Sequence, residues 1–317
     1  MYMFKTKLFL ARFMNRLSRR SSGRSAGNLS LTAINSFDQY KKHQQASINE
    51  YAHRSEVEKQ LEGSHNGFYT PGYCYVCSRS VNFHSSFSYA FTDAEGNQKP
   101  NWREHLLCPS CGLNNRIRAA IQIFGQTCKP RLDDAIYLTE QITPLFHWFA
   151  RNYQNVVGSE YLGNKIPFGQ SDKSGLRNET LTGLTFTDSR FNYILSFDVF
   201  EHIPDYLSAF RECLRCLKPA GALIFSVPFQ RNSDRHIVRA RMLPNGGVEH
   251  ILPPEYHGDP LDSSGTLCFY HFGWELLEEL HRLGFGSVKS YLYWSQEFGY
   301  LGHEQLMFIA RKDIPEI

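Results

Sequence analysis

The sequence lacks an apolar run long enough to cross a lipid bilayer, and the apolar stretch at residues 8–11 is too short for the core of a secretory signal. The chain also has little net charge, +3 over 317 residues, so charge alone does not indicate a nucleic-acid partner. These absences argue against a membrane-spanning or secreted protein and predict a cytoplasmic one. With 42% hydrophobic residues, the chain is able to bury one full domain core and to carry an accessory module.

Acidic residues are absent from the first 37 positions, which hold seven Lys or Arg. Apolar residues, among them Phe4 and Phe13, are interleaved with these cations, a pattern typical of a basic amphipathic helix. Three interpretations remain open, namely an organellar transit peptide, a helix that touches a membrane surface, and a solvated tail. Residues 36–62 are rich in Gln, Lys and Glu, so we predict that residues 1–62 form a basic tail and a helical segment.

Four of the eight cysteines form two Cys-x-x-Cys pairs, Cys74 with Cys77 and Cys108 with Cys111. Two tight turns of this kind supply the four corners of a tetrahedral zinc site. Alternating apolar residues between the pairs favour a small β-ribbon, so we predict a zinc ribbon and a connecting helix over residues 63–130. Four thiolates leave no open position on the ion, which makes a structural Zn²⁺ the expected role. Free buried thiols or a redox pair are the alternative.

A strand, an acidic turn, a helix and a second strand follow one another in residues 191–229. An apolar run ends at Asp198, and Asp205 is placed to cap the helix. Lys218, Pro219 and Gly221 predict the end of this helix, and residues 222–227 read as a buried strand. The order is half of a doubly wound α/β fold, in which ligands bind at the carboxyl ends of the strands.

Two motifs in this block, D-V-x-E-H-I-P-D at residues 198–205 and R-x-L-K-P-x-G at residues 215–221, resemble the class I S-adenosylmethionine-dependent methyltransferases. The resemblance covers roughly residues 132–311, about one domain in length. It implies an α/β fold with a Rossmann-like, seven-stranded methyltransferase sheet and an antiparallel last strand over residues 131–317. It also implies S-adenosylmethionine as the cofactor.

The loop after the first strand of this domain departs from the family. The family's Gly-rich loop is replaced by TEQITPL after residues 135–138, and there is no glycine between Gln126 and Gly158. Either Glu140 holds the cofactor's ammonium group while the helix N-terminus at Thr143 meets its carboxylate, or the site is degenerate.

The remaining cofactor contacts are also implied by the resemblance. Glu160 ends the second strand, where the family has a ribose-binding carboxylate, and the segment RNETLTGLTF occupies the position of the adenine-binding residue. The expected cofactor-binding residues are Glu140, Gln141, Glu160, Tyr161, Glu179, Thr180 and Asp198.

His202 is the expected catalytic base, because it follows the fourth strand and a hydroxyl acceptor must lose a proton. Asp198, Glu201 and His202 form a D-x-x-E-H cluster, similar to the E-x-x-E-H metal site of some O-methyltransferases. A divalent cation there would lower the pKa of an acceptor hydroxyl, with His250 or His257 as a further ligand. The alternative is an architectural role, in which Glu201 and His202 only shape the turn.

A long polar insertion at residues 230–271 lies at the end of the fifth strand, where the acceptor must enter. Its candidate acceptor-binding residues are Arg239, His250, Tyr256, His257 and Asp259. We expect O-methylation of a saccharide or another small hydroxylated metabolite. Two alternatives remain open, an RNA or protein methyltransferase that uses the ribbon as a reader, and a non-catalytic scaffold with a methyltransferase fold.

Overall fold

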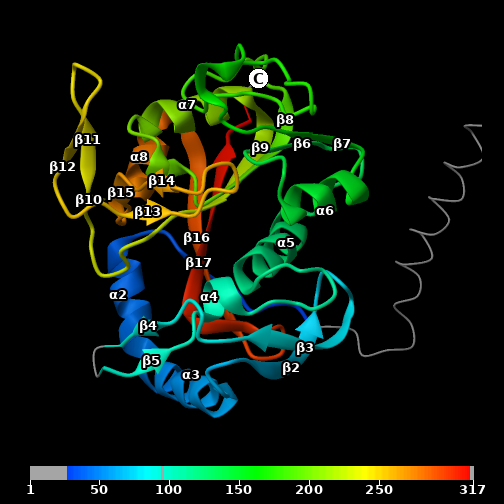
Figure 1. Cartoon of the computed structure of the whole chain (residues 1–317), viewed down its shortest axis with the longest axis vertical. Helices are drawn as coiled ribbons and strands as arrows, with labels where there is room; N and C mark the ends of the chain where they lie inside the picture. Colours follow the sequence, from blue (N-terminus) through cyan, green and yellow to red (C-terminus); the bar gives the residue numbers. More distant parts are fainter. Residues whose placement is uncertain (1–26, 94–95, 315–317) are drawn as a thin grey trace, which may run out of the picture.

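The computed structural model describes residues 27–93 and 96–314 (Figure 1). The basic segment therefore lies almost wholly outside the described residues. A seven-stranded sheet forms the centre, with the strand order β1-β16-β17-β9-β8-β6-β7. The strands are β1 (Thr32–Ile34), β6 (Ala135–Leu138), β7 (Asn155–Gly158), β8 (Phe191–Phe197), β9 (Leu217–Ser226), β16 (Phe285–Ser295) and β17 (Tyr300–Lys312).

The directions of the strands confirm a mixed α/β methyltransferase sheet. The neighbours β7, β6, β8 and β9 are parallel, whereas β17 is antiparallel to both β9 and β16. The segment RNETLTGLTF, expected near a third strand of this sheet, forms no strand and makes only the isolated bridges Glu160–Asn178 and Ser171–Arg177. Buried Glu179 accepts hydrogen bonds from Arg177 and Thr185, which holds this segment in a compact loop.

The strand that completes the sheet, β1, comes from the segment expected to be a tail and helices. It pairs antiparallel with β16 at the opposite edge, where Ser290 donates a hydrogen bond to the carbonyl of Ile34. The helices α2 (Phe37–Ala46) and α3 (Ile48–Leu61) follow it. The N-terminal segment is therefore partly built into the sheet.

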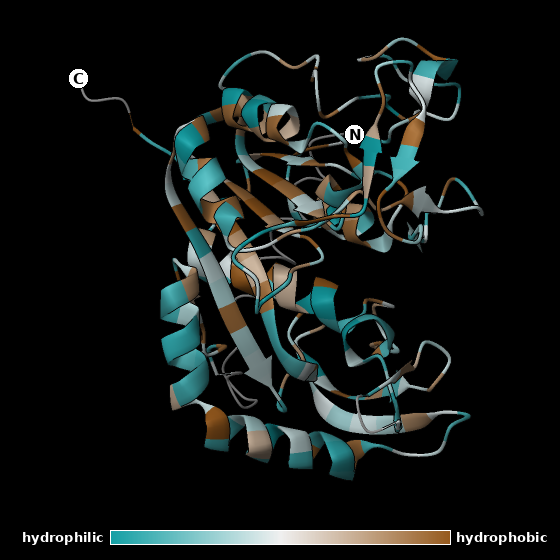
Figure 2. Ribbon diagram, turned by 90° about the vertical axis from the view of Figure 1, so that its left-hand side faces the viewer, coloured by the Kyte–Doolittle hydropathy of each residue, from teal (hydrophilic) through white to brown (hydrophobic). Residues whose placement is uncertain are grey.

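Helices cover both faces of the sheet. The apolar cluster on one face includes residues of α2, α7 (Tyr206–Cys216) and α8 (Glu275–Leu283), and the cluster on the other includes residues of α5 (Asn115–Cys128) and α6 (Pro144–Asn152). Neighbouring residues of β9 alternate between the clusters, as a strand buried on both faces requires. In Figure 2 brown residues lie along the sheet and teal ones on the peripheral helices.

Local signals position the elements that bear the site. The carboxylate of Asp205 accepts a hydrogen bond from Ser208 N at 3.1 Å and so caps α7 as expected. Thr143 caps α6 with Pro144 at its first position, and Asn114 caps α5. The Thr143 and Asp205 caps fix the starts of the helices that follow β6 and β8, next to the carboxyl ends of these strands.

The cysteine segment lies at one end of the long β16–β17 pair (Figure 1). It contains β2 (Phe68–Cys74), β3 (Arg79–Ser85), β4 (Phe91–Thr92), β5 (Gln98–Lys99) and α4 (Trp102–His105). A small apolar cluster joins Cys74, Phe83 and Cys108 to Leu301 of β17. Fully buried Arg118 of α5 donates to the carbonyls of Phe298 and Gly299, so the segment and the sheet share one interior.

The insertion folds into short strands across the carboxyl end of the sheet. It contains β10 (Ile237–Val238), β11 (Ala240–Met242), β12 (Val248–His250), β13 (Tyr256–His257), β14 (Thr266–Leu267) and β15 (Tyr270–His271). It packs on η2 (Phe200–His202), and η1 (Gly163–Lys165) follows β7. Within the described part of the chain, no helix combines the length and apolar character needed to cross a membrane.

Candidate active site and cysteine cluster

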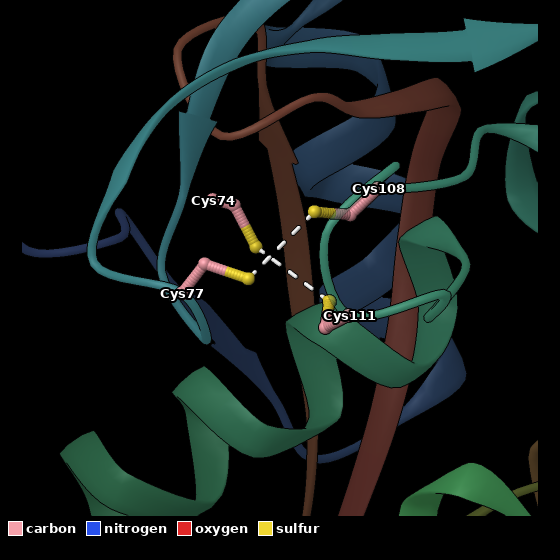
Figure 3. A group of neighbouring side chains, drawn as sticks. All are labelled: Cys74, Cys77, Cys108 and Cys111. Carbon is pink, nitrogen blue, oxygen red and sulfur yellow. Dashed lines mark hydrogen bonds between the residues drawn. The ribbon is translucent and has the colours of Figure 1, made fainter.

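The four predicted zinc ligands converge on one point (Figure 3). The Sγ atoms of Cys74 and Cys111 are 3.9 Å apart, and those of Cys77 and Cys108 are 3.8 Å apart. All four sulfur atoms lie within 4.8 Å of one another. Zn–S bonds of about 2.3 Å in a tetrahedron place the sulfur atoms about 3.8 Å apart. The cluster therefore has the donor type and the spacing of a closed zinc site.

Asp198, directly after β8, is held by two arginines, one from the cysteine segment and one from α5. The Nη1 and Nη2 atoms of Arg103 in α4 donate to the Asp198 carboxylate at 3.0 and 3.1 Å. Arg116 Nε in α5 lies 3.4 Å from the same carboxylate, and the Ser226 hydroxyl donates to it at 2.7 Å. Burial alone would raise the pKa of Asp198, but the two guanidinium groups outweigh it and hold that pKa well below its usual range.

The backbone of Asp198 adds to the constraint on this turn. Its φ is +54°, in the left-handed region, which Asp and Asn visit more readily than most residues. With its oxygens taken by Arg103 and Ser226, Asp198 does not join Glu201 and His202 in a metal-ligand group. The D-x-x-E-H cluster of the sequence is thus divided, with Asp198 facing the cysteine segment.

Glu201, three residues further on, faces the insertion. Its side chain is fully buried, and neither carboxylate oxygen makes a hydrogen bond within the described residues. Two imidazole nitrogens approach its Oε1 atom, Nδ1 of His257 at 3.4 Å and Nε2 of His202 at 3.6 Å. Burial raises the pKa of Glu201. The donor atoms of these three residues lie within 4.8 Å of one another.

The outer nitrogens of the two imidazoles are held by other partners. His202 Nδ1 lies 2.8 Å from the carbonyl oxygen of Leu267 and must donate to it, which leaves the lone pair of the neutral ring on Nε2. His257 Nε2 lies 2.9 Å from Glu255 Oε1 and its Nδ1 lies 3.4 Å from Glu201 Oε1, so each nitrogen of the ring can carry a proton that faces a carboxylate. Such outer hydrogen bonds orient histidines that bind metals.

The insertion contributes a second group, Glu255, His257 and Cys268, whose donor atoms also lie within 4.8 Å of one another. Here the carboxylate is fully paired, because Glu255 contacts His257, His271 and Arg239 at distances of 2.9, 3.1 and 3.1 Å. Contacts with Cys268 and Glu201 raise the pKa of His257 to about 11. Glu255 therefore orients His257, whereas Glu201 contacts only the two imidazoles through longer distances of 3.4 and 3.6 Å.

The other expected acceptor residues are more scattered. His250 and Tyr256 are exposed on β12 and β13, and His250 belongs to neither donor group. Of the two proposed further ligands, the structure therefore brings His257 to Glu201. Arg239 donates to the carbonyl of Pro253 as well as to Glu255. Asp259 accepts from Leu261 N and from Thr266, which fixes the turn before β14.

Glu160 lies two residues beyond the end of β7 and not at the end of the strand as expected, and one of its oxygens is occupied by the glycine-poor loop. Oε1 accepts from Gln141 N at 2.6 Å and from Ile142 N at 3.0 Å. Burial raises the pKa of Glu160, and the Asp259 charge adds to this effect. Gly158 gives the loop room, because a Cβ there would lie 2.7 Å from the carbonyl oxygen of Glu140. The loop is therefore ordered by β7 and not by glycines of its own.

Glu140 itself is partly buried beside α6, and burial raises its pKa to about 7. Arg116, Glu160 and Asp198 all influence this carboxyl group electrostatically, which places it among the strand ends of β6 and β8. The side chain of Gln141 is tied to a neighbouring loop, since it contacts Gly175 O and Arg177 N. Glu140, which interacts with Thr143 at the start of α6, is therefore the side chain of this pair that is not tied to the neighbouring loop.

Of the residues expected to contact the adenine, some are buried and paired within the protein and others are exposed. Glu179 is buried and fully paired with Arg177 and Thr185, whereas Thr180 contacts only Thr182 through its hydroxyl. Tyr161 is 69% exposed and stacks on Phe168 at a centroid distance of 6.3 Å. This aromatic pair, next to Glu160, presents an apolar surface beside the expected ribose position.

Sequence reasoning missed Arg103, Arg116, Glu255 and Cys268. Arg103 and Asp198 are 95 positions apart, and no local pattern links them. For Arg116 one signal exists, since it lies just after the second cysteine pair in a helix whose other face is apolar. Glu255 stands two positions before His257, a spacing that places both on one face of a strand.

A family model described as "Methyltransferase domain" matches residues 106–285, more than half of the chain. "Ubiquinone biosynthesis O-methyltransferase" of Cereibacter sphaeroides is 31% identical over 141 residues, which cover 37% of this chain and 57% of that protein. "Demethylmenaquinone methyltransferase" of Staphylococcus epidermidis is 32% identical over 74 residues, which cover 22% of this chain and 31% of that protein. The chain thus matches little more than half the length of the first relative and less of the second.

Among solved structures, a Burkholderia thailandensis enzyme, 1,6-didemethyltoxoflavin-N1-methyltransferase with bound 1,6-didemethyltoxoflavin and S-adenosylhomocysteine, is 17% identical. Its TM-score is 0.39, and the match covers 62% of this chain and 78% of that chain. An S-adenosylmethionine-dependent methyltransferase of Mesorhizobium loti is also 17% identical, with a TM-score of 0.37 and coverage of 61% and 98%.

Proposed function

The chain belongs to the methyltransferase-domain family, and from this we propose that it transfers the methyl group of S-adenosylmethionine to a hydroxyl group of a saccharide or another small hydroxylated metabolite. One observation carries the proposal. The insertion covers the carboxyl end of the sheet and brings His257 to the Glu201 and His202 turn, where two imidazoles lie against a buried carboxylate that accepts no other hydrogen bond within the described residues. The name of the Cereibacter sphaeroides relative, an O-methyltransferase, supports a hydroxyl acceptor.

His202 acts as the base in the simplest form of this proposal. Its Nδ1–H is held by the Leu267 carbonyl, so Nε2 is oriented to accept a proton from a hydroxyl group. Fixing the acceptor in line with the sulfonium methyl group supplies most of the remaining rate enhancement. The short strands of the insertion exclude water from the Glu201 carboxylate, which is fully buried beneath them.

We also infer that the same site can bind a divalent cation. Glu201, His202 and His257 would hold it, because a buried carboxylate and two oriented imidazole nitrogens are the donors of a transition-metal site, and the ion would replace the proton on His257 Nδ1. Asp198 is not among the ligands, because its oxygens are taken by Arg103 and Ser226. When bound, such an ion lowers the pKa of an acceptor hydroxyl. Glu255 would then orient His257 from outside the site.

Cofactor binding and zinc binding complete the proposal. Glu160 and the Tyr161–Phe168 pair are the proposed contacts for the ribose and the adenine, and Glu140 for the ammonium group. We propose that Zn²⁺ fills the Cys74, Cys77, Cys108 and Cys111 cluster. Its four sulfur donors leave no position for substrate, so the ion would stabilise the fold.

The proposal is tested with S-adenosylmethionine that carries a radiolabelled methyl group. The purified protein is incubated with a panel of saccharides and small hydroxylated metabolites, or with total RNA or a protein extract, with and without added Mn²⁺. We expect label in a small-molecule acceptor and its loss in His202→Gln. Label only in RNA or protein would contradict the proposed acceptor, and no label together with no cofactor binding by calorimetry would support a non-catalytic scaffold.

A further inference from the structure

The hairpin of β13 and β14 brings a carboxylate, an imidazole and a thiol to one face of the insertion. Directly next to the β13–β14 pairing, Cys268 N donates to the carbonyl oxygen of Glu255 at 2.8 Å, so the two residues are cross-strand neighbours. His257 lies two positions after Glu255 and therefore on the same face, because side chains alternate along a strand. The donor atoms of the three residues lie within 4.8 Å of one another.

One oxygen atom of Glu255 faces two imidazoles. Its Oε1 lies 2.9 Å from His257 Nε2 and 3.1 Å from His271 Nε2, so a second ring reaches the same point from β15. The other oxygen, Oε2, pairs with Arg239 at 3.1 Å. Two imidazole nitrogens, one carboxylate oxygen and one thiolate are a full donor set for four-coordinate Zn²⁺, and the two anions balance the charge of the ion.

The thiol lies on the buried side of this group. Cys268 is fully buried, and its Sγ atom lies 3.3 Å from the carbonyl oxygen of Tyr270. The side chains of Glu255, His257 and His271 are partly exposed. An ion can therefore enter past the carboxylate and the imidazoles and reach a thiolate that solvent does not reach.

His257 faces a different carboxylate with each of its nitrogens. Its Nδ1 lies 3.4 Å from Glu201 Oε1, whereas Nε2 faces Glu255. A neutral ring that binds an ion through Nε2 keeps its proton on Nδ1, where the proton faces Glu201. Because a neutral imidazole has one lone pair, an ion beside Glu255 and an ion beside Glu201 exclude each other.

The strand that carries Cys268 also orients the proposed base. On one side of Cys268, the carbonyl oxygen of Leu267 accepts a hydrogen bond from His202 Nδ1 at 2.8 Å. On the other side, the N–H of Phe269 donates to the carbonyl oxygen of Glu201 at 2.7 Å. An ion bound by the thiolate between them would therefore fix both backbone groups that hold the turn.

We propose that the insertion binds a zinc ion of its own through four side chains, those of Glu255, His257, Cys268 and His271. Binding releases the proton of the thiol and turns the ring nitrogens that face Glu255 from hydrogen-bond donors into ligands. The ion would fasten the insertion over the carboxyl ends of the strands. The inference goes beyond the proposed function and does not depend on it, because a structural ion needs neither cofactor nor acceptor.

Zinc content and cobalt spectra test this site. Wild type, Cys268→Ser and His271→Gln are loaded with Zn²⁺, unbound metal is removed, and zinc per chain is measured by mass spectrometry. We expect Cys268→Ser to hold about one zinc ion fewer per chain than wild type, and His271→Gln to bind that ion about a hundredfold more weakly. In protein loaded with Co²⁺, Cys268→Ser should lose part of the thiolate-to-cobalt charge-transfer band.

Two matched variants keep the outcomes apart. Cys213→Ser removes a fully buried thiol of α7 that belongs to no donor group of the described residues, and it should keep the zinc content and the cobalt band of wild type. Glu201→Gln should keep both as well. Zinc binding like that of wild type in Cys268→Ser and in His271→Gln would overturn the proposal. Loss of zinc in Glu201→Gln but not in Cys268→Ser would also overturn it, because the ion would then lie at Glu201. A Cys268-dependent zinc ion in a protein that transfers no methyl group would contradict the proposed function alone.

Discussion

Asp198 and Glu201 lie three residues apart in one turn, yet their surroundings are opposite. Asp198 faces the cysteine segment, accepts hydrogen bonds from Arg103 and Ser226, and has a lowered pKa. Glu201 faces the insertion, has no hydrogen-bond partner within the described residues, and has a raised pKa. The first arrangement is complete as it stands and fixes the turn. The second is incomplete, which is what a site that receives a ligand requires.

The largest effect is expected on the side of the turn that faces the cysteine segment, when a proposed zinc ligand is removed. Cys108→Ser should lose the bound metal and lower the free energy of unfolding by at least about 4 kcal/mol, because metal binding energy is folding energy in such sites. Metal content by mass spectrometry and urea denaturation measure the two effects. Cys128→Ser is the matched control, since Cys128 is a partly buried cysteine of α5 that belongs to no donor group. Equal zinc content in the two variants would remove the proposed zinc site.

A smaller loss is expected when Asp198 is neutralised. Asp198→Asn keeps a residue that tolerates the positive φ but leaves Arg103 and Arg116 without their shared anion. We expect a loss of about 2 kcal/mol, because these side chains are only partly buried. Because the pKa of Asp198 is lowered in the folded state, this stability is present above about pH 4 and disappears as the pH falls through the folded pKa. Urea denaturation at several pH values measures it, and a pH-independent difference between the two proteins would contradict the ion pairing.

Neutralising Glu201, which faces the insertion, should change the stability in the opposite direction. Glu201→Gln removes a buried carboxylate for which the cost of burial outweighs the two imidazole contacts, so the metal-free protein should be as stable as wild type or more stable by about 1 kcal/mol, while methyl transfer falls. Because the pKa of Glu201 is raised in the folded state, wild type should lose stability relative to the variant as the pH rises above the ordinary Glu value of 4.5. Thermal unfolding from pH 4 to 8 measures this difference. A large destabilisation at neutral pH would mean that Glu201 has a structural partner.

The smallest effect concerns Glu140, which lies in the loop between β6 and α6. Its pKa is about 7, and only the ionised carboxylate binds an ammonium group well. The affinity for S-adenosylhomocysteine should therefore rise about fivefold between about pH 6 and pH 8, as ionisation becomes complete. Calorimetry over this range, with Glu140→Gln as the pH-independent reference, measures the change. The same slope in both proteins would assign the titration to another group.

The features that could be predicted from sequence are those encoded by neighbouring residues. The cysteine spacing, the end of β8 before Asp198 and the Asp205 cap are all local patterns, and the structure contains each of them. The resemblance to the methyltransferase family extended these patterns to a whole sheet. The family match agrees with that extension.

What sequence could not provide depends on distant contacts. Whether Asp198 meets a cation or a metal depends on Arg103, which has no fixed spacing from it. The choice of His257 over His250 depends on the path of the insertion, because both histidines lie in similar polar surroundings in the sequence. Glu179 sits where an adenine ligand was expected, yet its pairing with Thr185 makes it a loop support.

The pairing of β1 with β16 has a consequence for the order in which the protein is made. The bond from Ser290 to Ile34 spans 256 positions, so this edge of the sheet stays open on the ribosome until almost the whole chain has emerged. Until then β1 has no partner, and an unpaired strand edge is a template for association with other chains. When β16 emerges, the short strand β1 is already available to cover its free edge, and a chain that lacks residues 32–34 would leave that edge open.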